Sequence, residues 1–147
     1  MTSVGGTTYT YDNVGNLTSD GTNTYTWDDA NRLKQVGNVS FTYDGLGRRD
    51  SKNVNGTIEY YHFDGDRVAY VTNSAGAVLK RFTYDASGRP VYMGANGTLY
   101  YYHYNAHGDV VKMTDLSGNT VAEYKYDAWG NITDSTGTHH APTVGTY

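Results

Sequence analysis

The chain has 147 residues, a net charge of −4 and a pI near 5.6. This acidic balance argues against nucleic-acid binding, because no basic stripe is available to neutralise phosphates. The sequence contains no cysteine, which excludes a disulfide framework and any thiolate metal site. No apolar run approaches about 18 residues and the N-terminus lacks a leader pattern, so we expect a soluble chain whose export signal, if it has one, lies in a longer parent.

The composition predicts strands rather than helices. Sixteen tyrosines and eighteen glycines, with only two prolines, depart strongly from average usage. Aromatic and threonine enrichment together with many turn formers favours strands. Apolar residues never follow the i, i+3, i+4, i+7 spacing over three turns, so no long helix is expected.

One pattern, aromatic–any residue–aromatic–Asp, recurs along the chain. It occurs seven times, at residues 9–12, 25–28, 41–44, 61–64, 82–85, 102–105 and 124–127, with Asn105 in place of the acid in the sixth copy. The steps from each second aromatic to the next are 16, 16, 20, 21, 20 and 22 residues. Self-similarity of this kind predicts a repeat architecture.

Glycine stands three residues after the acid in five copies; Asn31 takes that place in the second copy, and the fourth is one residue shorter. We take the second aromatic, the acid and the glycine as the structural signature of the repeat. The signature residues are Tyr11, Asp12, Gly15, Trp27, Asp28, Tyr43, Asp44, Gly47, Phe63, Asp64, Tyr84, Asp85, Gly88, Tyr104, Gly108, Tyr126, Asp127 and Gly130.

Each copy predicts a β-hairpin. Residues i and i+2 of a strand share a face, so both aromatics point one way and the intervening Thr, His or Lys points the other. Asp and Gly fit the first and fourth positions of a type I turn, where the carboxylate accepts backbone N–H groups and the glycine adopts a positive φ. A second strand follows, and then a second turn at pairs such as Asn55-Gly56, Asn96-Gly97 and Gly118-Asn119.

The predicted fold is an all-β antiparallel meander of about 12 to 14 short strands, in which hairpins stack because one hairpin alone is only marginally stable. Strands are expected over residues such as 7–11, 39–43, 58–63, 78–84, 98–104 and 121–126. The repeat array is expected over 1–137, with copies near 9–24, 25–40, 41–60, 61–81, 82–101, 102–123 and 124–137, followed by a tail at 138–147.

The motifs YDNVGNL, YDGLGRR, YDASGRP and YDAWGNI resemble the repeat of the Rhs/YD-repeat family, and residues 100–132 are similar to the last repeats of its bacterial members. The resemblance covers nearly the whole chain. It implies an open segment of the spiralling β-sheet that members of this family wind into a hollow shell. In polymorphic toxins and toxin complexes, that shell encloses a toxic C-terminal domain.

The sequence also departs from the family. Members usually continue after such a last repeat into a core-associated segment and an aspartyl autocleavage site, and neither pattern appears before Tyr147. Seven repeats are also fewer than a closed shell uses. The resemblance therefore implies a fragment or a truncated paralogue that would not enclose a toxin by itself.

Possible ligand residues have structural explanations. His103, His107 and Asp109 lie within seven residues and could be interpreted as a metal site. However, His103 is expected on the face opposite the aromatics, His107 in a turn, and His139-His140 on an exposed tail. The turn aspartates are a whole repeat apart and bind the backbone, which argues against calcium. We predict no metal and no cofactor.

The sequence also lacks a catalytic constellation. Ser51, Ser74, Ser87 and Ser117 occur singly in turn-like contexts, and none lies in a Gly-x-Ser-x-Gly motif. No glycine-rich stretch carries the lysine of a phosphate-binding loop. We predict that the chain is not an enzyme.

Two function classes remain open. The first is a structural module, a shell or scaffold wall of a secreted or cell-surface, toxin-associated bacterial protein, with neighbouring repeats or other copies of the chain as partners. The second is a carbohydrate-binding or adhesive module, which a row of exposed, co-aligned rings would favour. Unpaired strand edges are expected near Tyr9–Tyr11 and Tyr124–Tyr126, and they predict head-to-tail self-association.

Overall fold

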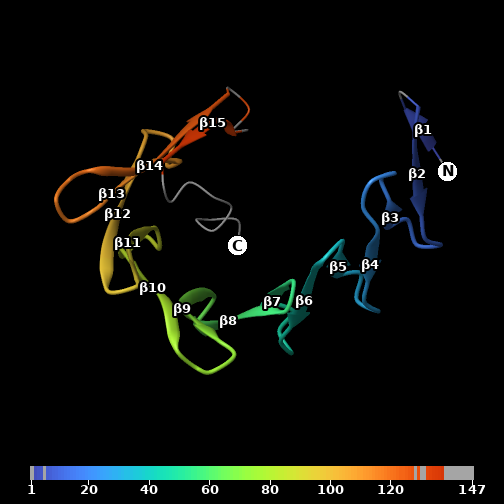
Figure 1. Cartoon of the computed structure of the whole chain (residues 1–147), viewed down its shortest axis with the longest axis horizontal. Coiled ribbons are helices and arrows are strands. Elements are labelled where there is room, and N and C mark those ends of the chain that lie inside the picture. The colour runs from blue at the N-terminus through green and yellow to red at the C-terminus, as the bar shows by residue number, and fades with distance from the viewer. Residues whose placement is uncertain (1, 5, 128, 130–131, 138–147) are drawn as a thin grey trace. The chain divides into compact units, whose positions relative to one another are not determined.

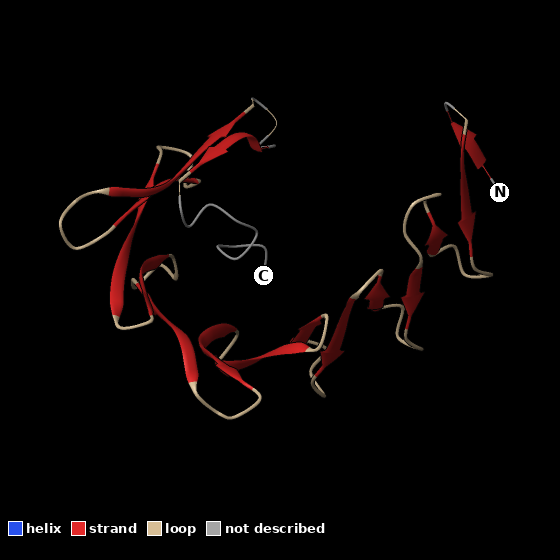
Figure 2. Ribbon diagram, viewed as in Figure 1, coloured by secondary structure: helices blue, strands red, loops and turns tan. Residues whose placement is uncertain are grey.

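The structure is a computed structural model that describes residues 2–4, 6–127, 129 and 132–137. These residues form strands joined by turns and loops, and no helix occurs among them (Figure 2). Accordingly, the described part of the chain holds no helix that could cross a membrane.

The strands follow one another along the chain in short steps (Figure 1). They are β1 (Thr2–Val4), β2 (Thr7–Tyr11), β3 (Leu17–Ser19), β4 (Tyr25–Trp27), β5 (Leu33–Val36), β6 (Val39–Tyr43), β7 (Arg49–Val54), β8 (Thr57–Asp64), β9 (Arg67–Asn73), β10 (Val78–Tyr84), β11 (Pro90–Ala95), β12 (Thr98–Tyr104), β13 (Val110–Thr114), β14 (Thr120–Tyr126) and β15 (Ile132–Thr136).

The fold is an open antiparallel meander in which strand order equals chain order. Strands β1 to β3 form a three-stranded sheet, and β4 to β15 form a twelve-stranded sheet. The chain divides into two compact units, one of Met1–Asp66 with Val71–Val78 and one of Arg67–Tyr70 with Leu79–Tyr147. The contacts discussed below lie within one unit or the other.

The predicted all-β meander is confirmed, and the strands expected at 7–11, 39–43 and 78–84 are those that form. Two details were wrong. The described residues contain fifteen strands, more than the sequence predicted. Strand β1 pairs with β2, placing Thr2 opposite Tyr9, and β15 pairs with β14, placing Lys125 opposite Asp134. Within the described residues, the strands of Tyr9–Tyr11 and Tyr124–Tyr126 are therefore paired on both sides and are not sheet edges.

A register shift accompanies most of the second aromatics. It falls between Thr42 and Tyr43, for example, and again between His103 and Tyr104. The cause is the turn that follows: Gly47 N–H donates to the Asp44 carbonyl at 3.0 Å, and Asp44 N–H donates to the Arg48 carbonyl at 2.9 Å. This closes a type I turn with one extra residue, which bulges the strand next to the aromatic.

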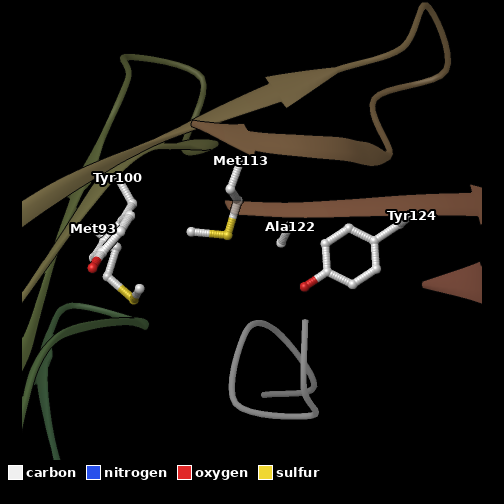
Figure 3. Close-up of a cluster of buried hydrophobic side chains, with 5 residues drawn as sticks. All are labelled: Met93, Tyr100, Met113, Ala122 and Tyr124. Atoms are coloured by element: carbon white, nitrogen blue, oxygen red, sulfur yellow. The ribbon is translucent and has the colours of Figure 1, made fainter. Parts of the chain in front are cut away.

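The best-packed region of the second unit is a cluster on one face of β11 to β14 (Figure 3). Its buried members are Met93, Tyr100, Met113, Ala122 and Tyr124. The register brings them together, because Met93 lies opposite Tyr100 and Met113 opposite Ala122. Alternate residues of neighbouring strands thus build one apolar face, as period-2 patterning requires.

Candidate functional site: contacts between successive repeats

The acid of the signature organises its own turn. In the second copy, Asp28 Oδ1 accepts the backbone N–H groups of Ala30 and Arg32, both at 2.9 Å. The sixth copy replaces the acid with Asn105, whose Oδ1 accepts the N–H groups of His107 at 2.9 Å and Asp109 at 3.0 Å. An amide oxygen serves as well as a carboxylate because the turn needs only an acceptor.

These hydrogen bonds favour the charged form of the acids. The backbone N–H of Arg32, followed by its guanidinium, lowers the pKa of Asp28. The Ser87 hydroxyl and then the Arg89 N–H lower the pKa of Asp85 to about 2. The pKa values of Asp12 and Asp44 are lowered as well, since side-chain and backbone donors outweigh partial desolvation. These four turn acids are therefore anionic at neutral pH.

An arginine directly after the turn links two copies. Arg32 Nε lies 2.7 Å from Asp28 Oδ2, and its guanidinium lies 4.7 Å from the ring centroid of Tyr43, the second aromatic of the next copy. Arg48 repeats this arrangement with Asp44 at 2.7 Å and Phe63 at 4.3 Å. In the second unit, Arg89 lies over Tyr104 at 5.5 Å. The acid thus orients an arginine that stacks on the neighbouring copy.

The second aromatic itself reaches back to the preceding copy. Its polar atom donates a hydrogen bond to the backbone carbonyl that follows the arginine position. The five bonds are Trp27 to Leu17 at 2.8 Å, Tyr43 to Leu33 at 2.7 Å, Tyr84 to Val68 at 2.8 Å, Tyr104 to Pro90 at 2.5 Å and Tyr126 to Val110 at 2.7 Å. We call this bond, together with the stacked arginine where there is one, the inter-repeat clasp.

Burial keeps the clasp hydroxyls in their donor form. It raises the pKa of Tyr84, Tyr104 and Tyr126 above the usual value for a phenol. A neutral phenol can donate a hydrogen bond and a phenolate cannot, so the clasp is intact at neutral pH.

The fourth copy departs from this scheme. Its second aromatic is Phe63, which has no hydroxyl, and its shorter turn carries Gly65 at a φ of 58°. Arg48 stacks on Phe63 and also donates to the carbonyl of Gly65. Arginine contacts therefore link the third and fourth copies in place of the missing hydrogen bond.

The structure places most of the predicted signature residues in turns and clasps. Positive φ angles occur at Gly15, Gly47, Gly88 and Gly108, and also at Asn31, which replaces glycine in the second copy. Asp127 accepts the N–H of Trp129 at 2.8 Å, whereas Gly130 lies outside the described residues. In the shorter fourth turn, Asp64 is the last residue of β8.

The exposure of the rings bears on the carbohydrate alternative. Tyr11 is 48% exposed, whereas the other second aromatics, from Trp27 to Tyr126, are only partly exposed. The first aromatics are partly or fully buried, Tyr61 and Tyr124 most of all. Within the described residues, the signature rings do not form a row of exposed, co-aligned surfaces.

The residues considered as metal ligands occupy separate environments. His103 bonds through Nε2 to the Thr114 hydroxyl at 2.9 Å, on the face opposite the buried cluster. His107 lies in the turn organised by Asn105, as predicted. Among the residues that the structure describes, no three His, Cys, Asp or Glu side chains gather into a potential metal site. His139-His140 lies outside the described residues.

Sequence reasoning missed two parts of this interface. One is the role of the arginines at 32, 48, 67 and 89. The sequence feature that could have indicated this role is that each of these arginines directly follows the turn of its copy. The other is the form of some second turns: the turn expected at Gly118-Asn119 is organised by Asp115, which accepts the N–H groups of Ser117 and Asn119, and Asn73 accepts those of Ala75 and Ala77 in the same way. The spacing of an acid or amide three residues before glycine, taken without the aromatics, would have found them.

Comparisons with known proteins agree with this architecture. The family model described as teneurin YD-shell matches residues 1–145. Over 89 residues, the chain is 52% identical to the tRNA(Glu)-specific nuclease WapA of Bacillus subtilis subsp. natto (strain BEST195) and 46% identical to the tRNA nuclease WapA of Bacillus subtilis (strain 168). Each match covers 59% of this chain and 4% of the relative, so the chain corresponds to a small part of these proteins.

A solved structure shares the fold. The Photorhabdus luminescens Tc holotoxin pore matches with a TM-score of 0.54 and 18% identity. The match covers 88% of this chain and 9% of that one.

Proposed function

The chain belongs to the teneurin YD-shell family, and we propose that it is a non-enzymatic structural module, a segment of shell wall in a longer secreted or cell-surface protein. The observation that carries this proposal is the inter-repeat clasp, because five of the seven second aromatics are used to bind one copy to the one before it. Side chains committed to such contacts give the array mechanical continuity and leave few groups for chemistry.

The nuclease activity in the names of the WapA relatives belongs, in this proposal, to other parts of those proteins. The turn acids of this chain bond to backbone N–H groups and arginines, as in Asp28 with Arg32. A general acid or base must be free to exchange its proton near neutral pH. The lowered pKa of Asp85, about 2, is therefore consistent with a structural role.

The proposal predicts no cleavage of tRNA by the purified chain and a stability that depends on the clasps. Tyr84→Phe and Tyr104→Phe each remove one hydroxyl donor. Each change should lower the free energy of unfolding by about 0.5–1.5 kcal/mol, which is seen as a lower melting temperature. Tyr60→Phe, at an exposed tyrosine outside the clasps, is the matched control. If tRNA cleavage co-purified with the chain and disappeared on mutation of its turn acids, the structural assignment would be wrong.

The proposed function includes self-association through the terminal strands. Within the described residues, β15 has a strand partner on one side only, and all five of its side chains are exposed. An open edge of this kind pairs with another strand. Light scattering over a concentration series should show assembly, and Thr133→Pro, which takes one backbone N–H away from β15, should reduce it. A chain that stays monomeric at high concentration would contradict this part.

A further inference from the structure

Two hairpins of the array turn at the same dipeptide. Asn55-Gly56 joins β7 to β8 and Asn96-Gly97 joins β11 to β12, and the sequence contains no other Asn-Gly pair. All four residues have positive φ angles, between 50° and 89°. Two-residue loops of this kind are type I′ turns, for which Asn-Gly is a preferred sequence. Both loops are exposed, so water reaches each of them.

The two turns differ in the strand that enters them. The register around the two loops is the same, so Asn53 and Gly94 hold equivalent places two residues before the asparagine of the turn. Asn53 Oδ1 accepts the backbone N–H of Gly56 at 2.8 Å. Gly94 has no side chain that could do the same, and within the described residues no turn or side-chain acceptor takes the N–H of Gly97. The first turn therefore holds its glycine nitrogen through a hydrogen bond that the second turn lacks.

An Asn-Gly pair can undergo an internal reaction that modifies the asparagine. The backbone nitrogen of the glycine attacks Cγ of the asparagine, so that a new nitrogen–carbon bond forms. The carboxamide nitrogen leaves as ammonia, taking up the proton of the glycine N–H, and a cyclic succinimide remains. One water molecule then opens the ring at either carbonyl and leaves aspartate or isoaspartate. Glycine favours the attack because it has no Cβ to hinder the approach of its nitrogen.

We propose that Asn96 is a site of spontaneous deamidation, whereas the hydrogen bond from Gly56 to Asn53 protects Asn55. The attacking nitrogen must lose its proton and turn toward the asparagine side chain. At Gly56 that proton is held by Asn53 Oδ1, so the hydrogen bond has to break first. The need to break one neutral hydrogen bond slows a reaction about fivefold. This modification goes beyond the structural role of the chain and needs no second copy.

Isoaspartate at position 96 changes the hairpin. It adds one backbone methylene to a two-residue loop, and the length of such a loop sets the register of its strands. Strands β11 and β12 place Met93 opposite Tyr100 in the buried cluster (Figure 3). Deamidation at Asn96 therefore weakens the hairpin that carries this part of the cluster.

Mass spectrometry of the wild-type chain compares the two sites directly. The purified chain is incubated in mildly alkaline buffer and digested at intervals, with an unincubated sample as the zero point. Each site is followed by the mass gain of about 1 Da that accompanies replacement of the amide NH2 by OH. We expect deamidation at Asn96 to be at least about fivefold faster than at Asn55. No mass gain at Asn96, or equal rates at the two sites, would overturn the proposal.

Variants of the entering strands test whether the hydrogen bond causes the difference. Gly94→Asn supplies the missing acceptor and should slow the reaction at Asn96 about fivefold. Gly94→Ala is the control, because it stiffens the strand without adding an acceptor, and its Cβ would lie 3.5 Å from Leu99 Cδ2, an ordinary contact. In the first hairpin, Asn53→Ala should speed the reaction at Asn55 about fivefold. Equal slowing by the two changes at position 94, or an unchanged rate at Asn55 in Asn53→Ala, would overturn the proposal.

Discussion

At the scale of single residues, the turn acids and the glycines that follow them determine where each hairpin bends. Asp28 satisfies two backbone donors through one oxygen and orients Arg32 through the other. Asn105 performs the first task without a charge. The charge is thus needed to hold an arginine, whereas the turn requires only an acceptor at this position.

The lowered pKa values of the turn acids predict acid sensitivity. A carboxyl whose pKa is lower in the folded than in the unfolded chain contributes stability that is fully present above its unfolded pKa, near 3.9, and is lost as the pH falls through its folded pKa. For Asp85 the folded value is about 2, and the pKa values of Asp12, Asp28, Asp44 and Asp115 shift in the same direction. The melting temperature should therefore fall between about pH 5 and pH 2.

Asp85→Asn is the matched variant for this experiment. Asparagine keeps the acceptor, as Asn105 does, but does not titrate in this range. The variant should lose less stability than the wild type over the same pH interval, as measured by thermal unfolding. A pH profile identical to that of the wild type would mean that the turn acids do not cause the acid sensitivity.

Gly88 tests the backbone requirement of the turn. Its φ is +88°, and a Cβ added there would lie 2.2 Å from Arg67 Nη2. Gly88→Val should destabilise the chain by about 1–3 kcal/mol, because a β-branched residue is strained at positive φ. Gly45→Val is the control, since Gly45 has no positive φ and no atom within 4 Å of its added Cβ. Equal losses of melting temperature would argue against a conformational cause.

At the scale of elements, the hairpins are short and depend on their neighbours. The strands have 3 to 8 residues, too few for an isolated hairpin to be stable. The clasp provides a side-chain link in addition to the backbone ladder. It joins five of the seven second aromatics to the strand before them, and an arginine stacks on the same ring where one is present.

The fourth copy offers a gain-of-stability test of the clasp. Phe63→Tyr adds the hydroxyl that its counterparts use, and the expected acceptor is the carbonyl of Arg49, the residue after the stacked Arg48. We expect stabilisation of about 0.5–1.5 kcal/mol, seen as a higher melting temperature. Phe41→Tyr is the control, because the first aromatic of a copy makes no clasp bond. Stabilisation by both changes, or by neither, would count against the clasp geometry.

At the scale of the whole molecule, the sheets of the described residues join only strands that are neighbours in the chain. Stability in such arrays is a sum of local terms and nearest-neighbour terms. Damage to one clasp should therefore stay local within a unit.

Hydrogen exchange can measure this locality in the first unit. Trp27→Phe removes the indole N–H that bonds to Leu17 at 2.8 Å. Amide protection should fall in β3 and β4 and stay unchanged in β6 and β7, because opening free energies follow local contacts. A uniform loss of protection over the unit would indicate cooperative unfolding and contradict the nearest-neighbour description.

The sequence by itself determined the parts of this protein that depend on local physics. The two-residue period of Tyr124 and Tyr126 marks a strand, and the spacing of Asp85 and Gly88 marks a turn, because side-chain alternation and backbone φ are decided within a few residues. The position of His103 opposite the aromatics followed from the same period.

The tertiary structure decided which atoms join successive copies. The clasp bonds connect residues 10 to 16 positions apart across a connection of variable length, and no local pattern specifies that register. It also decided that β1 and β15 pair with β2 and β14, since short strands with few aromatics become strands through the partner that pairs with them.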